Sequence, residues 1–291
     1  MTYTVPAEYD GQSVQTFLRR GCGLSWRMVV RLKYHPGGLT ADGEPIRSID
    51  RLRAGQTVRL CMPDDEIHIE GVPMPLDIVY EDEHLLLLNK PPYLAVHPSA
   101  GKPDPTLANA VVAHYAAQGT PHSFRPVNRL DRNTSGLLLA AKNPHIAYRL
   151  TGQTRKEYRA IVLGRMEGAG TIDQPIRVKE GCCITREVGD GGKPSVTHYE
   201  TLACDDELSY LRVVLETGRT HQIRVHLSWL GHPLAGDTMY GEDETVMPRH
   251  ALHCARMTFD HPVTGEPLSF AAPLCEDMRR VLLEHGFPPD V

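Results

Sequence analysis

Two short, unbroken apolar runs, Leu85–Leu88 and Leu137–Ala141, constrain the fold of this chain most strongly. Each is too short for a typical helix and is flanked by polar residues, so we predict strands over Leu85–Lys90 and Leu137–Ala141, the second of them buried. Glu157–Leu163 alternates as a further strand, and Thr197–Cys204 and Tyr210–Glu216 flank an acidic turn as a hairpin. These segments predict a central sheet, and the hairpins favour antiparallel pairing.

Helical segments are interleaved with these strands. Thr106–Tyr115, about Pro144 to Gly152, and Thr220–Leu230 have helical spacing. Strands outnumber helices, and the sequence contains no internal repeat or low-complexity segment. We therefore predict an α+β fold for residues 76–291, with a largely antiparallel mixed sheet flanked by helices.

A smaller unit precedes this region. Residues 1–62 predict a compact α/β domain that ends in the strand Thr57–Leu60. Its second helix begins after Ser25, a suitable N-cap, and carries Arg27, Arg31 and Lys33. Residues 63–75 contain acids and prolines but no Lys or Arg, and are predicted to be a linker.

Several classes of protein are disfavoured by the sequence. No apolar run reaches the length of a membrane span, and the N-terminus lacks the pattern of a secretory signal. Seven cysteines without a CxxC pair indicate reduced thiols and a cytoplasmic protein. Nucleotide-binding loops, metal-binding motifs and serine-hydrolase motifs are absent, so we expect neither a cofactor nor a metal. Nothing in the sequence requires more than a monomer.

The distribution of charge points to a polyanionic partner although the whole chain is acidic. The formal net charge is −5 and the pI is about 6.3. Residues 1–62 nevertheless contain nine Lys/Arg against five Asp/Glu, and residues 125–165 contain nine against two. Because salt screens distant charges, such local basic regions can bind RNA. Solvated surface charge is the alternative explanation for these counts.

Asp131 is the first candidate catalytic residue. It lies among Arg125, Arg129 and Arg132, in a loop that leads into the buried strand Leu137–Ala141. Nearby cations would keep its carboxylate ionised, which suits a nucleophile or an electrostatic stabiliser. A structural role, in which the Asp caps a turn and pairs with an Arg, would also fit the local pattern.

Two other stretches contain candidate residues. Tyr158 lies on a predicted strand, where it could stack on a base, accept a proton or simply fill the core. Arg219 follows a glycine turn at the start of the helix 220–230, from which its side chain could project into a cleft. His221 and Arg224 share one face of that helix, and a polar helix surface is the alternative reading.

Together these stretches resemble the RluA-type family of RNA pseudouridine synthases. Five segments occur in the family's order: YEDEHLLLLNKPPYLAVHPS (80–99), RPVNRLDRNTSGLLLAAKN (125–143), KEYRAIVLG (156–164), LETGRTHQIRVHLSWLGHPLAGDTMYG (215–241) and LHCARMTFDHPVTGEP (252–267). They span nearly all of residues 76–291. One difference is Asn128, which stands where the family usually has a His before Arg-Leu-Asp.

The resemblance implies an isomerase that breaks the bond between ribose and nitrogen 1 of uracil, rotates the base and attaches the ribose to carbon 5. It assigns the catalytic carboxylate to Asp131, by attack at the sugar or by deprotonation to a glycal-like intermediate. It implies that Tyr158 stacks on the uracil or helps to remove the proton from carbon 5. It also implies that Arg219 is the basic partner that orients Asp131.

The resemblance further implies how RNA is held. Arg129 would fill the space left by the extruded uridine, and Arg125 and Arg132 would contact backbone phosphates. Residues 1–62 resemble an S4-like RNA-binding module, in which Arg27, Arg31 and Lys33 would contact RNA. The appended module favours ribosomal RNA over transfer RNA as substrate. The alternatives are a transfer-RNA enzyme, a nucleoside hydrolase or lyase, and an RNA-binding assembly factor whose catalysis is secondary or lost.

Overall fold

The computed structural model describes residues 1–61, 68–98, 105–120, 122–241 and 245–289. The first part of the chain contains β1 (Thr2–Thr4), a 3-10 turn (Ala7–Tyr9), α1 (Val14–Thr16), a π-helical turn (Phe17–Gly21), α2 (Trp26–Tyr34), β2 (Leu39–Ala41), β3 (Glu44–Pro45) and β4 (Thr57–Leu60). No helix among the described residues is both long and apolar enough to span a membrane.

The second part alternates strands and helices. It contains β5 (Ile78–Glu81), β6 (Leu85–Lys90), α3 (Leu107–Ala117), β7 (Arg125–Pro126), β8 (Ser135–Ala141), α4 (Pro144–Leu150), β9 (Arg155–Leu163), β10 (Ala169–Asp173), β11 (Ile176–Val178), β12 (Arg186–Val188), β13 (Val196–Cys204), β14 (Leu208–Leu215), α5 (Gln222–Trp229), β15 (Leu252–Asp260), β16 (Pro267–Ala271) and α6 (Glu276–Glu284).

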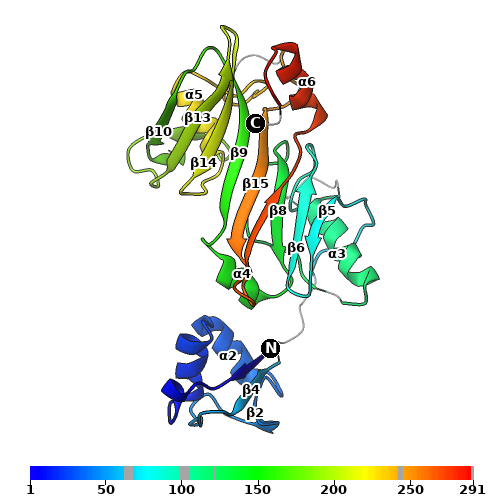
Figure 1. The fold of residues 1–291 in the computed structure, drawn as a ribbon, viewed down its shortest axis with the longest axis vertical. Coiled ribbons are helices and arrows are strands. Elements are labelled where there is room, and N and C mark those ends of the chain that lie inside the picture. Colours follow the sequence, from blue (N-terminus) through cyan, green and yellow to red (C-terminus); the bar gives the residue numbers. More distant parts are fainter. Residues whose placement is uncertain (62–67, 99–104, 121, 242–244, 290–291) are drawn as a thin grey trace.

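The N-terminal unit has its own sheet and its own core. Its strands have the order β1-β4-β2-β3, and its buried cluster, which includes Phe17 and Leu32, is separate from the others. The predicted N-cap at Ser25 is confirmed, because its Oγ accepts the Met28 N–H at 3.2 Å. Figure 1 shows this unit at one end of an elongated molecule. Tyr3 Oη reaches across to His145 Nε2 of α4, at 3.3 Å.

The predicted linker is described only in part. Residues 62–67 lie outside the described residues, and residues 68–75 form neither helix nor strand. This described part runs along α3, where the Val72 N–H donates to the Asn109 carbonyl at 3.1 Å and Asn109 Nδ2 donates to the Glu70 carbonyl at 2.8 Å. Residues 68–75 are therefore bound to the body of the second unit.

The second unit is built on a ten-stranded sheet. Eight strands have the order β10-β13-β14-β9-β15-β8-β6-β5, while β16 pairs with β15 and β7 with β8. Every pairing in this sheet is antiparallel except that of β15 with β8. The predicted mixed, largely antiparallel sheet is thus confirmed. β15 lies between β9, which carries Tyr158, and β8, which follows the Asp131 loop.

The parallel pairing of β8 with β15 depends on a glycine. Gly136 is opposite Cys254 and has a φ of +102°, a conformation that is unfavourable for residues with a side chain. A Cβ at this position would lie 2.3 Å from the Cys254 carbonyl oxygen. The absence of a side chain therefore lets the two strands approach and fixes the start of β8.

Helices cover both faces of the sheet (Figure 1). Val111 of α3 and Leu227 of α5 share a buried cluster with Leu211 of β14. Met278 of α6 packs instead with Tyr210. Tyr210 precedes Leu211 on β14, so its side chain points to the opposite face of the sheet. The expected flanking helices are present, and α6, β10 and the small β11–β12 pair add to the predicted elements.

Candidate active site

The loop that carries Asp131 is held by a buried lysine at its base. Lys90 Nζ donates to the carbonyl oxygens of Pro91 at 2.7 Å, Leu94 at 2.9 Å and Arg132 at 3.0 Å. Its side chain is fully buried, and this burial lowers the pKa of Lys90 to about 7. The three hydrogen bonds join the segment after β6 to the Asp131 loop, which limits movement of the carboxylate.

Asn128 fixes the other side of the same loop. Its Oδ1 accepts the Leu139 N–H at 2.8 Å, and its Nδ2 donates to the Leu137 carbonyl at 3.2 Å. Asn128 is buried, so these hydrogen bonds to β8 satisfy both of its polar atoms. The residue at the family's usual His position therefore anchors the loop to the sheet.

The charge partner of Asp131 is Arg224, which lies in the first turn of α5. Arg224 Nη1 donates to Asp131 Oδ2 at 3.3 Å, and its Nε and Nη2 donate to the two carboxylate oxygens of Asp237, each at 2.7 Å. Burial opposes ionisation of both residues of the Arg224–Asp237 pair. Their mutual hydrogen bonds outweigh burial, raising the pKa of Arg224 and lowering that of Asp237. Arg224 thus presents a fixed positive charge to Asp131.

Arg219, the predicted partner of Asp131, does not make this contact in the structure; Arg224 makes it. Arg219 is exposed and its Nε donates to the Pro194 carbonyl at 3.2 Å. His221, the N-cap of α5, has a left-handed backbone with a φ of 58°. The chain turns there before the helix begins, so Arg224 points to the carboxylate and Arg219 lies at the rim. That turn was not evident from helical spacing alone.

Tyr158 faces Asp131 from strand β9, which β15 separates from β8. Its side chain is 5 % exposed and lines, with Asp131 and Arg224, a cavity of about 50 Å³. Burial, reinforced by the nearby Cys254, raises the pKa of Tyr158 well above its usual value, so the phenol is neutral at physiological pH. A neutral ring at the wall of the cavity is suited to stacking on a base.

Arg129 lies where the cavity opens onto two wider clefts. It lines the 50 Å³ cavity, a cleft of about 440 Å³ and another of about 710 Å³. Arg129 is exposed and makes no ion pair with any described residue. The loop before Asp131 therefore places an exposed cation where the cavity of Asp131 meets the two clefts.

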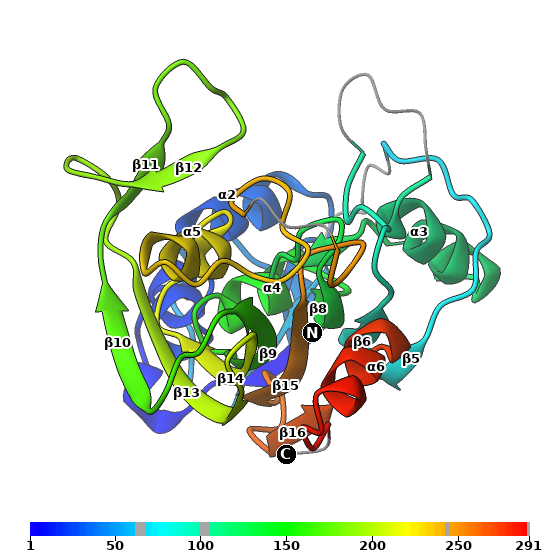
Figure 2. The ribbon, with the colours of Figure 1, turned by 90° about the horizontal axis from the view of Figure 1, so that it is seen from above.

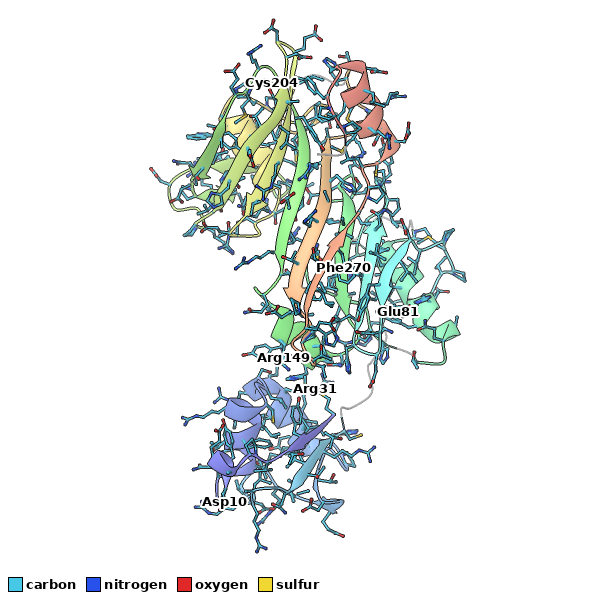
Figure 3. All side chains as sticks on the ribbon, in the orientation of Figure 1. Asp10, Arg31, Glu81, Arg149, Cys204 and Phe270 are labelled. Atoms are coloured by element: carbon cyan, nitrogen blue, oxygen red, sulfur yellow. The ribbon has the colours of Figure 1, made fainter. Side chains whose placement is uncertain are left out.

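The remaining predicted RNA contacts are dispersed. Arg132 is exposed beside the site and its Nε donates to the Tyr93 carbonyl at 3.1 Å, while Arg125 Nη1 donates to the Ser123 carbonyl at 3.0 Å. Arg27, Arg31 and Lys33 are exposed on α2 of the N-terminal unit and are not part of this site. Figure 3 labels Arg31 at the junction of the two units, near Arg149 of α4.

No group of three His, Cys, Asp or Glu side chains in the described ranges is arranged to hold a metal ion. The charged groups that line the cavity are instead one carboxylate, Asp131, and three arginines, Arg129, Arg219 and Arg224. This arrangement can stabilise positive charge that develops on a substrate.

Comparison with known proteins identifies the family. A model described as RNA pseudouridylate synthase matches residues 84–229. The chain belongs to this family. It is 39% identical over 282 residues to ribosomal large subunit pseudouridine synthase D of Vibrio vulnificus, with 87% of each chain covered. It is 39% identical over 268 residues to the uncharacterized RNA pseudouridine synthase YjbO of Bacillus subtilis, covering 89% of this chain and 95% of that protein.

A solved structure supports the same assignment. Human RNA pseudouridylate synthase domain containing 1 superposes with a TM-score of 0.58 and 30% identity, covering 71% of this chain and 87% of that one. The expected RluA-type resemblance is confirmed, and the protein is an isomerase that acts on RNA. Arg224, Asp237 and Tyr240 of this pseudouridine synthase belong to the site, although the sequence did not predict them as site residues. All three lie in the matching segment 215–241. The turn residues Gly236-Asp237 in this segment were the sequence signal that could have indicated this part of the site.

Proposed function

We propose that this pseudouridine synthase modifies uridines in large-subunit ribosomal RNA, with Asp131 as the catalytic carboxylate. The observation that carries the proposal is the cavity in which Asp131, its partner Arg224 and the ring of Tyr158 meet. The name of the Vibrio vulnificus relative supports the substrate class.

The chemistry follows from the arrangement of these groups. Cleavage of the bond to nitrogen 1 leaves positive character on the ribose, and the Asp131 carboxylate stabilises it by attack at the anomeric carbon or by removal of a sugar proton. The uracil stacks on Tyr158, rotates and bonds through carbon 5, from which a proton is then lost. Because atoms are only rearranged, the reaction consumes no co-substrate.

The surrounding cations suit an extruded uridine. Such a base leaves a gap in the RNA stack, and Arg129 stands at the entrance of the cavity to occupy it. Arg125 and Arg132 contact the backbone phosphates on either side. The N-terminal unit acts as an S4-like RNA-binding module, with Arg27, Arg31 and Lys33 on the outward face of α2, opposite its buried residues.

Tritium release from RNA that carries uridine labelled at carbon 5 tests this proposal. The wild type should release tritium from unmodified ribosomal RNA in preference to transfer RNA, and not from free uridine. Asp131→Asn, which has nearly the same shape, should release none while its RNA affinity stays close to that of the wild type. Equal release by Asp131→Asn would reject the catalytic assignment, and preference for transfer RNA would reject the substrate class.

A further inference from the structure

The β11–β12 pair forms an arm that stands apart from the main sheet. Within the described residues, β11 and β12 pair with each other and with no other strand. An isolated bridge between Ile176 and Lys193 marks the base of the arm. Figure 2 shows the arm projecting from the body beside α5. We refer to residues 176–188 as the arm.

A basic cleft separates the arm from the Asp131 loop. The cleft has a volume of about 440 Å³ and contains five cationic side chains, contributed by the arm, the segment after it, the Asp131 loop and the turn before α5: Arg129, Arg177, Arg186, Lys193 and Arg219. One acid of the arm, Glu187, offsets part of this charge by pairing with Arg177 Nε at 2.8 Å. The excess of positive charge suits the phosphates of a nucleic acid.

The arm contacts the body of the site through Tyr240. The backbone N–H of Arg186 donates to Tyr240 Oη at 2.9 Å. The same oxygen lies 2.8 Å from His221 Nδ1, and His221 Nε2 lies 3.8 Å from Asp131 Oδ2. A chain of polar contacts therefore runs from the arm to the catalytic carboxylate.

The positions of the protons along this chain follow from its chemistry. The Arg186 N–H can only donate, so Tyr240 Oη accepts from it and keeps its own proton available to donate to His221 Nδ1. Burial lowers the pKa of His221, so its ring is neutral at physiological pH, and a Tyr240 hydroxyl that donates to Nδ1 leaves the single ring proton on Nε2. The opposite tautomer would place a lone pair against the Asp131 carboxylate. In this tautomer the Nε2–H faces the Asp131 carboxylate, with Nε2 3.8 Å from Oδ2.

The ring of Tyr240 also contacts the other partner of Asp131. The guanidinium carbon of Arg224 lies 5.0 Å from the centroid of this ring, a cation–π distance. The Tyr240 N–H is 3.3 Å from Asp237 Oδ1, which itself binds Arg224. Tyr240 is therefore the one described residue that these contacts join to the arm, to His221 and to Arg224 together.

We propose that Tyr240 and His221 are positioning residues that tie the arm, which grips the phosphates flanking the target uridine, to the carboxylate of Asp131. This inference rests on the proposed function. When RNA fills the basic cleft it holds the arm against the body, and the Arg186–Tyr240–His221 contacts then hold Asp131 in the reactive geometry. Neither residue exchanges a proton with the substrate.

Single-turnover tritium release, with enzyme in excess over labelled ribosomal RNA, tests this coupling. Tyr240→Phe keeps the ring beneath Arg224 and removes only the hydroxyl. Because small misplacement of a reacting group can slow a reaction about 100-fold, we expect the rate at saturation to fall about 10- to 100-fold. The dissociation constant for RNA, measured by filter binding, should change less than about twofold, a difference of under about 0.4 kcal/mol.

The matched control is Tyr199→Phe. Tyr199 lies on β13 of the same sheet, and its hydroxyl makes no hydrogen bond with any described residue. This variant should retain the wild-type rate and affinity. If Tyr240→Phe behaves like Tyr199→Phe, or if its loss lies only in RNA affinity, the positioning role is refuted.

Two further variants test the ends of the chain of contacts. His221→Gln retains an amide donor that can face Asp131, whereas His221→Leu does not, so the Gln variant should be the faster of the two. Equal rates would refute the contact with Asp131. Lys193→Ala should weaken RNA binding and lower its salt dependence, and unchanged binding would remove the cleft from the RNA interface.

These outcomes separate the inference from the function on which it rests. Tritium release by the wild type with no effect of Tyr240→Phe overturns the inference alone. Absence of release by the wild type from every RNA overturns the proposed function as well.

Discussion

Replacement of Arg224 by alanine should destabilise the protein much more than replacement of Arg219. The Arg224 side chain is 7% exposed and that of Asp237 is fully buried. Arg224→Ala leaves the Asp237 carboxylate buried without its cation, whereas Arg219→Ala removes one exposed hydrogen bond to the Pro194 carbonyl. The two substitutions delete the same side chain from positions five residues apart, so they form a matched pair.

The expected magnitude follows from the burial of the Arg224–Asp237 pair. Removal of one partner from a buried ion pair costs about 3–5 kcal/mol. Asp237 Oδ1 keeps the backbone N–H of Met239 at 3.1 Å, which places the expected cost near the lower end, about 3 kcal/mol. Arg219→Ala should cost less than about 0.5 kcal/mol, as is usual for an exposed position. Since domain stabilities are about 5–15 kcal/mol, the Arg224 variant should still fold.

Urea unfolding followed by tryptophan fluorescence measures this difference. The chain has two tryptophans, Trp26 in α2 of the N-terminal unit and Trp229 in α5. In a Trp26→Phe background, Trp229 reports on the catalytic unit alone, which avoids mixing the unfolding of two separate cores. With a urea dependence of about 2–3 kcal/mol per molar, the midpoint for Arg224→Ala should fall by about 1 M.

The same variant has an expected pH dependence. In the wild type the pKa of Asp237 is lowered, so its contribution to stability is present at neutral pH and is lost as the pH falls through that lowered pKa. Without Arg224, burial raises the pKa of Asp237 above its unfolded value. The variant therefore loses most stability at neutral pH, where the unfolded chain favours the charged carboxylate. The cost of the substitution should therefore shrink between pH 7 and about pH 4. Equal, small costs for Arg224→Ala and Arg219→Ala at pH 7 would refute the reasoning.

Two further substitutions test the fold and the RNA-binding surface. Gly136→Ala places a Cβ 2.3 Å from the Cys254 carbonyl oxygen at a φ of +102°, so the melting temperature should fall and tritium release should be lost; a wild-type melting curve would contradict the close approach of β8 and β15. Combined replacement of Arg27, Arg31 and Lys33 by alanine should reduce the slope of log K against log salt by about two units if all three bind phosphates. An unchanged slope would remove α2 from the RNA interface.

The sequence predicted the sheet well because its strands are marked locally. Leu137–Ala141 lies within β8 (Ser135–Ala141), and Glu157–Leu163 lies within β9 (Arg155–Leu163). Apolar runs and the alternation of apolar and polar residues indicate a strand wherever one or both faces of the sheet are buried, whatever the rest of the fold. The arm, in contrast, consists of two three-residue strands among exposed and charged residues, and such strands carry no periodic signal.

The candidate site was predicted less completely, because its geometry depends on a single turn. Asp131 and Tyr158 were predicted as site residues and lie in one cavity. The partner of Asp131 was assigned to Arg219 by resemblance, whereas Arg224 makes the contact. Helical spacing places His221 and Arg224 on one face, but it does not indicate that His221 adopts a left-handed backbone before the helix begins.

The position of β15 also determines when this site can exist during synthesis. The strand that separates Tyr158 on β9 from the Asp131 loop at β8 is Leu252–Asp260, about 100 residues beyond Tyr158. At about 5–20 residues per second, a ribosome needs roughly 5–20 s to make that segment. A nascent chain therefore contains Asp131 and Tyr158 for several seconds without the strand that lies between β8 and β9. The cavity that these two side chains share therefore forms only after the segment up to Asp260 has been made.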